Sequence, residues 1–225
     1  MIRTAPSTEF FDNVVQRVLA RDEQPEGVLM QYSAIHDGEL IVGTLFRDAE
    51  AMRDTFVRFT SIEVQNQLRE TGESFDITRD EYELERLLIA RDVPVERFDA
   101  TPSSKIAAIT SELYNLTPEE YREVISELGW FDRPAPGRIA HVAYNHKGSM
   151  RSIDFWESRE ACEAWLDPSM TSRFDELLPG RRSDEMREAS WLDVHSLVVS
   201  LEPGDPLRDF ARTASGPSQE ADPSS

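Results

Sequence analysis

The stretch "NHKGSMRSIDFWES", residues 145–158, decides the fold, because the chain carries a second version of it 110 residues earlier. That version is "IHDGELIVGTLFRD", residues 35–48. Gly38 and Gly148 each end a two-residue turn between two strand-like segments, which is the pattern of a tight β-hairpin. Asp48 and Ser158 then stand where a helix N-cap belongs. We therefore expect a hairpin followed directly by a helix in both places.

The similarity extends beyond the hairpins. With the same offset, five identities coincide: Gly27/Gly137, His36/His146, Gly38/Gly148, Glu50/Glu160 and Ala51/Ala161. A helix with an apolar face is expected before each hairpin, in residues 7–22 and 116–129, the second with a Thr117–Glu120 capping box. A final strand is expected after each second helix, in residues 82–90 and 191–200. An opening strand is expected in residues 104–114, whereas its counterpart in residues 1–6 is short or missing.

Each half thus reads β-α-β-β-α-β, a split ferredoxin-like unit with helices on one face of its sheet. Two such halves can cover their open faces by turning them toward each other. The segments "GRIAHVAYNHKG", "SMRSIDFWESREACEAW" and "WLDVHSLVV", with their first-half counterparts, resemble the dimeric α/β-barrel superfamily, here as a fused tandem similar to antibiotic-biosynthesis-monooxygenase-like proteins.

We therefore expect an α+β fold in which two tandem ferredoxin-like halves form an intramolecular barrel of the dimeric type. The first half would span residues 1–100 and the second residues 101–202. The remaining acidic tail, residues 203–225, is rich in Pro, Ser and Gly and is expected to be disordered. Two independently packed domains are the alternative organisation.

The composition limits the partners. The formal net charge is −19, from 43 acidic and 24 basic residues, so the surface repels nucleic acid and anionic membranes. The single cysteine, Cys162, excludes a disulfide within the chain and a cysteine metal cluster. The chain has neither a membrane-spanning apolar run nor a secretory signal pattern, which predicts a cytoplasmic protein. A fused pseudo-dimer has less need to associate, so we expect a monomer whose partner is a small molecule.

Strand alternation suggests a site in the second half. Counting back from the turn pairs His141 with Asp154 on one face of the hairpin, with Trp156 two residues further on. An Asp beside a His fixes its tautomer and raises the basicity of its far nitrogen, as a general base requires. Trp156 would form an aromatic wall for a flat ligand. We expect this face to line the barrel interior, where the pair would act in catalysis or contact a ligand. The alternatives are a buried pair that only satisfies its own polar groups and a pair that faces solvent.

Five further residues are candidates for substrate binding. The equivalents of the second-half trio in the first half are Gln31, Thr44 and Phe46. Arg86 and His195 occupy matching places in the two final strands. In the superfamily's barrel the final strand of one half approaches the second strand of the other, which would bring Arg86 toward His141 and His195 toward Gln31. Arg86 would then bind a substrate carboxylate or enolate, or pair with a neighbouring glutamate.

The resemblance implies a small-molecule enzyme without a tightly bound organic cofactor: a cofactor-free monooxygenase, a cyclase or an isomerase acting on an aromatic or polyketide-like substrate. A non-catalytic binding protein that uses the same cavity is the competing interpretation. Haem binding is a weaker one, since no motif demands it. A metal site built from two histidines and a carboxylate is disfavoured, because the sheet order separates His195 from His141.

Overall fold

The structure is a computed structural model, and it describes residues 2–4, 7–21, 25–72, 77–90, 106–113, 116–166, 172–173, 176–177, 187–201 and 205. The tail expected to be disordered, residues 203–225, lies outside the described residues apart from Asp205.

The described elements fall into two successive sets, which we call the first and second halves. The first half contains β1 (Ile2–Thr4), α1 (Thr8–Leu19), β2 (Val28–His36), β3 (Glu39–Phe46), α2 (Ala49–Thr55), the π-helix η1 (Phe56–Thr60), α3 (Ser61–Thr71), β4 (Ile77–Arg79) and β5 (Leu84–Ile89). The second half contains β6 (Ala107–Leu113), α4 (Pro118–Glu127), β7 (Arg138–His146), β8 (Ser149–Trp156), α5 (Arg159–Trp165) and β9 (Arg187–Val199).

All described strands join one antiparallel sheet in the order β4-β1-β3-β2-β9-β6-β8-β7-β5. The two ends of this order, β4 and β5, are consecutive in the chain and joined by residues 80–83. A linker of this length spans at most about 18 Å. Nine strands laid flat would separate the end strands by about 38 Å. The sheet must therefore curl into a barrel-like shape, which confirms the expected α+β architecture.

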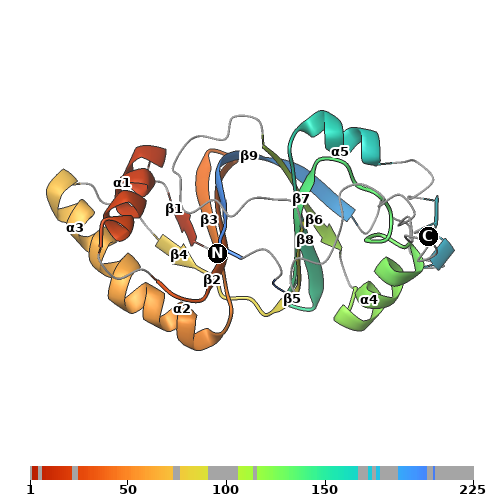
Figure 1. The fold of residues 1–225 in the computed structure, drawn as a ribbon, viewed down its shortest axis with the longest axis horizontal. Helices are drawn as coiled ribbons and strands as arrows, with labels where there is room; N and C mark the ends of the chain where they lie inside the picture. The colour runs from red at the N-terminus through yellow and green to blue at the C-terminus, as the bar shows by residue number, and fades with distance from the viewer. Residues whose placement is uncertain are drawn as a thin grey trace, which may run out of the picture.

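The helices lie outside the curled sheet. In Figure 1, α1, α2 and α3 stand on the side of β2 and β3, while α4 and α5 stand on the side of β7 and β8, with the strands between the two groups. The final strands cross between the halves as expected. The second part of β9 pairs with β2, and β5 pairs with β7. The sheet thus has one face toward the helices and one toward the interior.

Both hairpin turns have the geometry that the sequence predicts. Asp37 and Gly38 have φ angles of 53° and 81°, and Lys147 and Gly148 have φ angles of 52° and 86°. Two successive positive φ angles define the type I′ turn, whose twist matches that of the flanking strands.

The repeated glycine at the start of each hairpin has a packing reason. Gly27 and Gly137 have φ angles of 77° and 83°. A Cβ at Gly27 would lie 2.6 Å from the Cβ of Ala51, and one at Gly137 would lie 2.9 Å from the Cβ of Ala161. The identities Gly27/Gly137 and Ala51/Ala161 therefore mark the same close approach of a strand to a helix in each half.

The helix α4 begins with the capping box read from the sequence. The Thr117 hydroxyl accepts a hydrogen bond from the Glu120 N–H at 3.2 Å, and the Glu120 carboxylate accepts one from the Thr117 N–H at 3.0 Å. We expect Thr117→Ala to lower the free energy of unfolding by about 1 kcal/mol, because it leaves a helix N–H without its partner. Urea denaturation would measure the loss. Thr117→Ser, which keeps the hydroxyl, should be close to neutral, and an equal loss in both variants would contradict this account.

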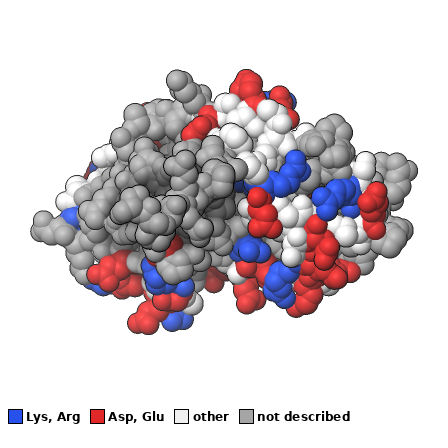
Figure 2. Space-filling model, turned by 45° about the vertical axis from the view of Figure 1, so that its right-hand side comes forward, with Lys and Arg blue, Asp and Glu red and all other residues white. Residues whose placement is uncertain are grey.

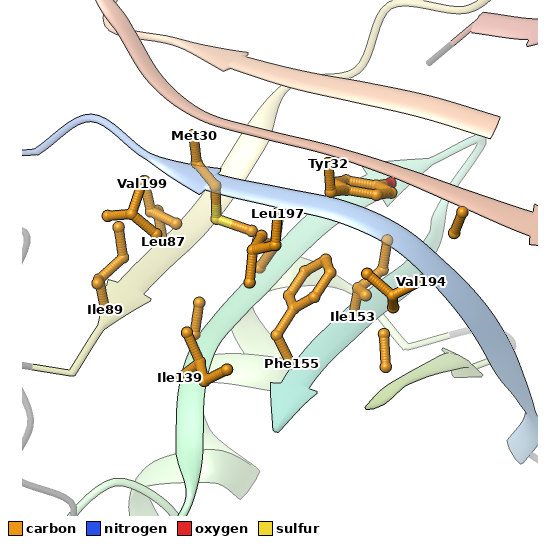
Figure 3. Packing of buried hydrophobic residues seen from close by; sticks show 14 of the residues in the cluster. Met30, Tyr32, Leu87, Ile89, Ile139, Ile153, Phe155, Val194, Leu197 and Val199 are labelled. Atoms are coloured by element: carbon orange, nitrogen blue, oxygen red, sulfur yellow. The ribbon is translucent and has the colours of Figure 1, made fainter. Parts of the chain in front are cut away.

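The barrel interior is filled by apolar side chains from both halves. Figure 3 shows Met30 and Tyr32 of β2 among residues such as Ile153 and Phe155 of β8. The rings of Tyr32 and Phe155 lie 5.1 Å apart between centroids. The two halves therefore share one core and are not packed as independent domains.

The first half leaves part of β3 unpaired, whereas the equivalent strand of the second half, β8, is paired to its end. Strand β1 pairs with β3 only from Leu40 to Val42. In the second half, β6 pairs with β8 from Met150 to Trp156. Among the described residues, the end of β3 from Gly43 onward therefore has no strand partner on the β1 side. The short opening strand expected from the sequence is confirmed, and it creates an open edge beside α2.

Candidate functional site

A cavity of about 620 Å³ lies along this open edge. Its lining comes from β2, β3, α2, η1 and residues 80–84 of the first half and from β7 and β8 of the second half. The volume is within the range of small-molecule sites. The lining residues are Tyr32, Gly43, Thr44, Leu45, Phe46, Asp48, Ala49, Met52, Phe56, Thr60, Asp80, Glu81, Tyr82, Glu83, Leu84, Val142, Tyr144 and Ile153.

One continuous helical segment, α2 followed by η1, forms the outer wall. Met52, Phe56 and Thr60 all line the cavity and are spaced four residues apart. Residues at this spacing drift around a regular α-helix, because a turn takes 3.6 residues. The π-helical turn from Phe56 to Thr60 is wider and rotates the side chains back. The π-helix thus keeps Thr60 on the cavity side.

Tyr32 contributes a buried hydroxyl. Tyr32 lies directly across the hairpin from Gly43, and a Cβ at Gly43 would be only 2.1 Å from Cε1 of the Tyr32 ring. Gly43 therefore makes room for the ring to lie flat over the strand. Tyr32 is 2% exposed, and burial, reinforced by Tyr144 and Tyr82, raises the pKa of its hydroxyl. No hydrogen bond joins that hydroxyl to another described residue, so it is a protonated donor left for a ligand.

Two further tyrosines form an aromatic wall beside Tyr32. The rings of Tyr82 and Tyr144 lie 4.8 Å apart at 31°, and Tyr82 also contacts the ring of His146 at 5.1 Å. Tyr82 belongs to the segment between β4 and β5, so the closure of the barrel also places this wall. The wall suits a flat, largely apolar ligand.

Of the predicted first-half trio, two residues line this cavity and the third supports one of them. Thr44 and Phe46 line it, and the Gln31 side-chain amide donates a hydrogen bond to the Thr44 hydroxyl at 3.2 Å. Because the Thr44 oxygen accepts the hydrogen bond from Gln31, the Thr44 O–H can donate a hydrogen bond to another group. Gln31 thus acts behind Thr44, and does not itself line the cavity.

The predicted His141–Asp154 pair forms, but not at the cavity. The two residues are register partners, and His141 Nδ1 lies 3.0 Å from Asp154 Oδ1. His141 Nε2 lies 2.7 Å from the hydroxyl of Tyr121 on α4. With Nδ1–H donating to Asp154, Nε2 accepts the Tyr121 proton, so both ring nitrogens are engaged. The expectation that this face lines the interior is wrong, since the pair lies under α4.

The sequence reading also missed a buried cation beside this pair. Arg138 is 1% exposed, and its Nε lies 3.6 Å from Asp154 Oδ1. Its guanidinium carbon lies 4.0 Å from the ring centroid of Trp165 and 4.9 Å from that of Trp156. Burial lowers the pKa of Arg138, while Asp154 opposes that shift. The available sequence signal was a charged residue that opens a mostly apolar strand.

The other predicted residues also lie on the helix-covered face. Trp156 is fully buried and packs against Trp165 at 5.6 Å, so it forms no ligand wall at the cavity. Arg86 does approach the His141 cluster, lying 5.0 Å from the ring of Phe131, which contacts His141. His195 Nε2 lies 2.9 Å from Asp12 of α1, so it joins β9 to the first half and does not line the cavity.

The sequence did not show which face of the sheet lines the interior, and this has a physical cause. Both faces of this sheet are buried, one by helices and one by the opposite half, so alternation along a strand separates the faces without saying which is inside. On β7, His141 lies under α4, whereas Tyr144, on the other face of the same strand, lines the cavity.

Within the described ranges, no group of three or more His, Cys, Asp or Glu side chains could hold a metal ion. No helix in the described part of the chain is long and apolar enough to cross a membrane.

The comparisons with known proteins bear on the fold. No protein-family model and no curated protein sequence matches the chain. Several solved structures do match, and two of them are each described as a "putative monooxygenase". The one from Lactobacillus acidophilus NCFM has a TM-score of 0.62 at 10% identity, covering 88% of this chain and 94% of that one. The one from Fusobacterium nucleatum has a TM-score of 0.59 at 11% identity, covering 88% and 92%. The chain therefore shares the fold of these monooxygenase-like proteins, as its sequence resemblance implied.

Proposed function

We propose that this protein is a monooxygenase-like small-molecule enzyme that takes a flat aromatic, polyketide-like substrate into the cavity beside β3, without a tightly held organic cofactor. The observation that carries the proposal is the buried Tyr32 hydroxyl at a cavity of about 620 Å³ walled by aromatic rings. The shared fold with two "putative monooxygenase" structures agrees with it.

The chemistry follows from the donor and the carboxylates. A substrate ketone seated on Tyr32 would accept a hydrogen bond that strengthens as the oxygen becomes an enolate. Asp80 and Glu83 line the same cavity and are candidates for the base that removes the proton. The enolate can react with dioxygen, which oxidises a methylene to a carbonyl and releases water. The same enolate would serve a cyclisation or an isomerisation.

His141 is not the base in this proposal. Both of its ring nitrogens have partners, and neither it nor Asp154 lines the cavity. At the equivalent first-half position, Thr44 lines the cavity and accepts a hydrogen bond from Gln31, which does not line it.

Anthrone is a suitable test substrate, because it is a flat tricyclic ketone with an acidic methylene. We expect it to consume dioxygen and form anthraquinone without added cofactor. Tyr32→Phe should lower kcat about 100-fold, because one donor to the developing oxyanion is lost. Tyr121→Phe is the matched control: it removes a buried hydroxyl that contacts His141 and should leave kcat nearly unchanged. A collapse of kcat in Tyr121→Phe alone would place the chemistry at His141 instead.

A non-catalytic binding protein is the second candidate, favoured by the lack of a histidine among the described lining residues. The neutral probe 2-(hydroxymethyl)anthraquinone separates the two possibilities. Binding of this probe without oxidation of anthrone would support a binding protein. If neither compound binds, both functions proposed for the cavity are wrong.

We also propose that the chain is a fused pair of ferredoxin-like units, residues 1–100 and 101–202, acting as a monomer. In support, the second half's strands follow the order β9-β6-β8-β7 within the sheet, and the first half's follow β4-β1-β3-β2. Both are the order 4-1-3-2 when strands are numbered within each half, with β5 added beside β7.

A further inference from the structure

The charge of the cavity lining is one-sided. Four carboxylic acids line it, namely Asp48, Asp80, Glu81 and Glu83, and none of the described lining residues is Lys, Arg or His. On the face of the molecule in Figure 2, by comparison, acidic and basic side chains are interspersed. Three of the four acids lie within residues 80–83, on the seam that joins β4 to β5. The charged groups among the described lining residues are therefore all acidic, which favours a cationic ligand over an anionic one.

The walls of the cavity add a second attraction for a cation. Five aromatic side chains line it: Tyr32, Phe46, Phe56, Tyr82 and Tyr144. The face of an aromatic ring is negative, so a positive group near several rings is stabilised, most strongly where water is excluded. Tyr144 is 6% exposed and Tyr32 is 2% exposed, so part of this wall is dry.

The polar groups that line the cavity lie at two different depths. The Tyr32 hydroxyl is buried and protonated, which suits a carbonyl oxygen. Asp48, Glu81 and Glu83 are exposed, and Asp80 is partly buried, so the carboxylates stand toward the solvent. A ligand that satisfies the polar groups at both depths has a carbonyl at its inner end and a positive charge at its outer end.

We propose, building on the function proposed above, that the cavity selects flat aromatic ketones that carry a protonated amine. The ketone accepts a hydrogen bond from Tyr32, the ring system lies between the aromatic walls, and the ammonium group remains near the carboxylates of residues 80–83. Aromatic acids and phosphorylated ligands are excluded by the same carboxylates.

Three anthraquinones that differ at one substituent test this selection. They are 2-(aminomethyl)anthraquinone, 2-(hydroxymethyl)anthraquinone and anthraquinone-2-carboxylate, measured by calorimetry on the full chain at low ionic strength. We expect the amine to bind about tenfold more tightly than the alcohol, and the carboxylate about tenfold more weakly. At about 0.5 M salt the spread should shrink to a few-fold, because exposed charges are screened.

A pair of variants locates the effect. Asp80→Asn combined with Glu83→Gln should lower the preference for the amine over the alcohol about fivefold, while affinity for the alcohol stays nearly constant. Glu123→Gln combined with Glu127→Gln is the matched control, since both are exposed acids on α4 that do not line the cavity. It also removes two negative charges from the chain and should leave the preference unchanged.

The outcomes separate this inference from the proposed function. If the alcohol binds and anthrone is oxidised but the amine binds no more tightly, the cation selection is wrong and the function stands. An equal loss of preference in the variant with Glu123→Gln and Glu127→Gln would also overturn the inference, because net charge and not the cavity would then be responsible. If none of the three compounds binds, the proposed use of the cavity fails as well.

Discussion

Replacing Tyr32 by Val and Gly43 by Ile together should preserve the fold and abolish binding of 2-(hydroxymethyl)anthraquinone. The equivalent positions in the second half are Val142 and Ile153, which already pack across their hairpin as a register pair. The double variant therefore copies a pairing that this fold accommodates. It also removes the Tyr32 hydroxyl and adds side-chain volume over β3, so the ligand loses both its donor and its space.

Each substitution alone should lower the free energy of unfolding more than the two substitutions together. Gly43→Ile alone forces a side chain into the Tyr32 ring and should lower the free energy of unfolding by about 1–3 kcal/mol. Tyr32→Val alone leaves a void over Gly43 and should also destabilise. A double-mutant cycle by urea denaturation measures the coupling, and calorimetry measures binding. Parent-like affinity in the double variant would show that the ligand site is elsewhere.

The second large effect is expected for Asp154→Ala, which should lower the free energy of unfolding by about 3–5 kcal/mol. It removes the carboxylate that lies beside both His141 and Arg138, and so leaves a buried guanidinium without its counter-charge. Affinity for 2-(hydroxymethyl)anthraquinone should not change under conditions where the variant is folded, because Asp154 does not line the cavity.

Thr44→Ala is the matched control for Asp154→Ala, since Thr44 holds the same place in the first hairpin. It should cost about 1 kcal/mol of stability, the usual size for one neutral hydrogen bond, and it should weaken ligand binding. The two variants thus predict opposite patterns in the two halves. A stable Asp154→Ala variant with lost ligand binding would contradict the assignment of the His–Asp pair to the packing under α4.

The two hairpins and the starts of the helices could be predicted from the sequence because their signals are local. The two turns, the N-caps at Asp48 and Ser158, and the Thr117 capping box all depend on residues within a few positions of one another. The crossing of the final strands was also foreseen, from the resemblance. The cross-strand partner of His141 followed from the turn length alone.

The location of the cavity could not be read in the same way. It depends on where β1 stops pairing, on the π-helical turn, and on the path of residues 80–83 past the end of β3. These are properties of segments that meet only in the folded chain. The short opening strand was noticed in the sequence, but its consequence, an open edge in the half without the His–Asp pair, needs the sheet order.

The central position of β9 affects the order of assembly on the ribosome. This strand is the last of the described strands to be synthesised, and it stands between β2 and β6 in the sheet. Until it emerges, β2 and β6 each present an unpaired edge, and the nascent chain holds two sheet fragments tied only by the chain and by β5 against β7. Such late, distant pairing slows folding and leaves strand edges open to other chains. The pairing of residues 187–199 is therefore the step at which the nascent chain changes from two sheet fragments into one closed sheet.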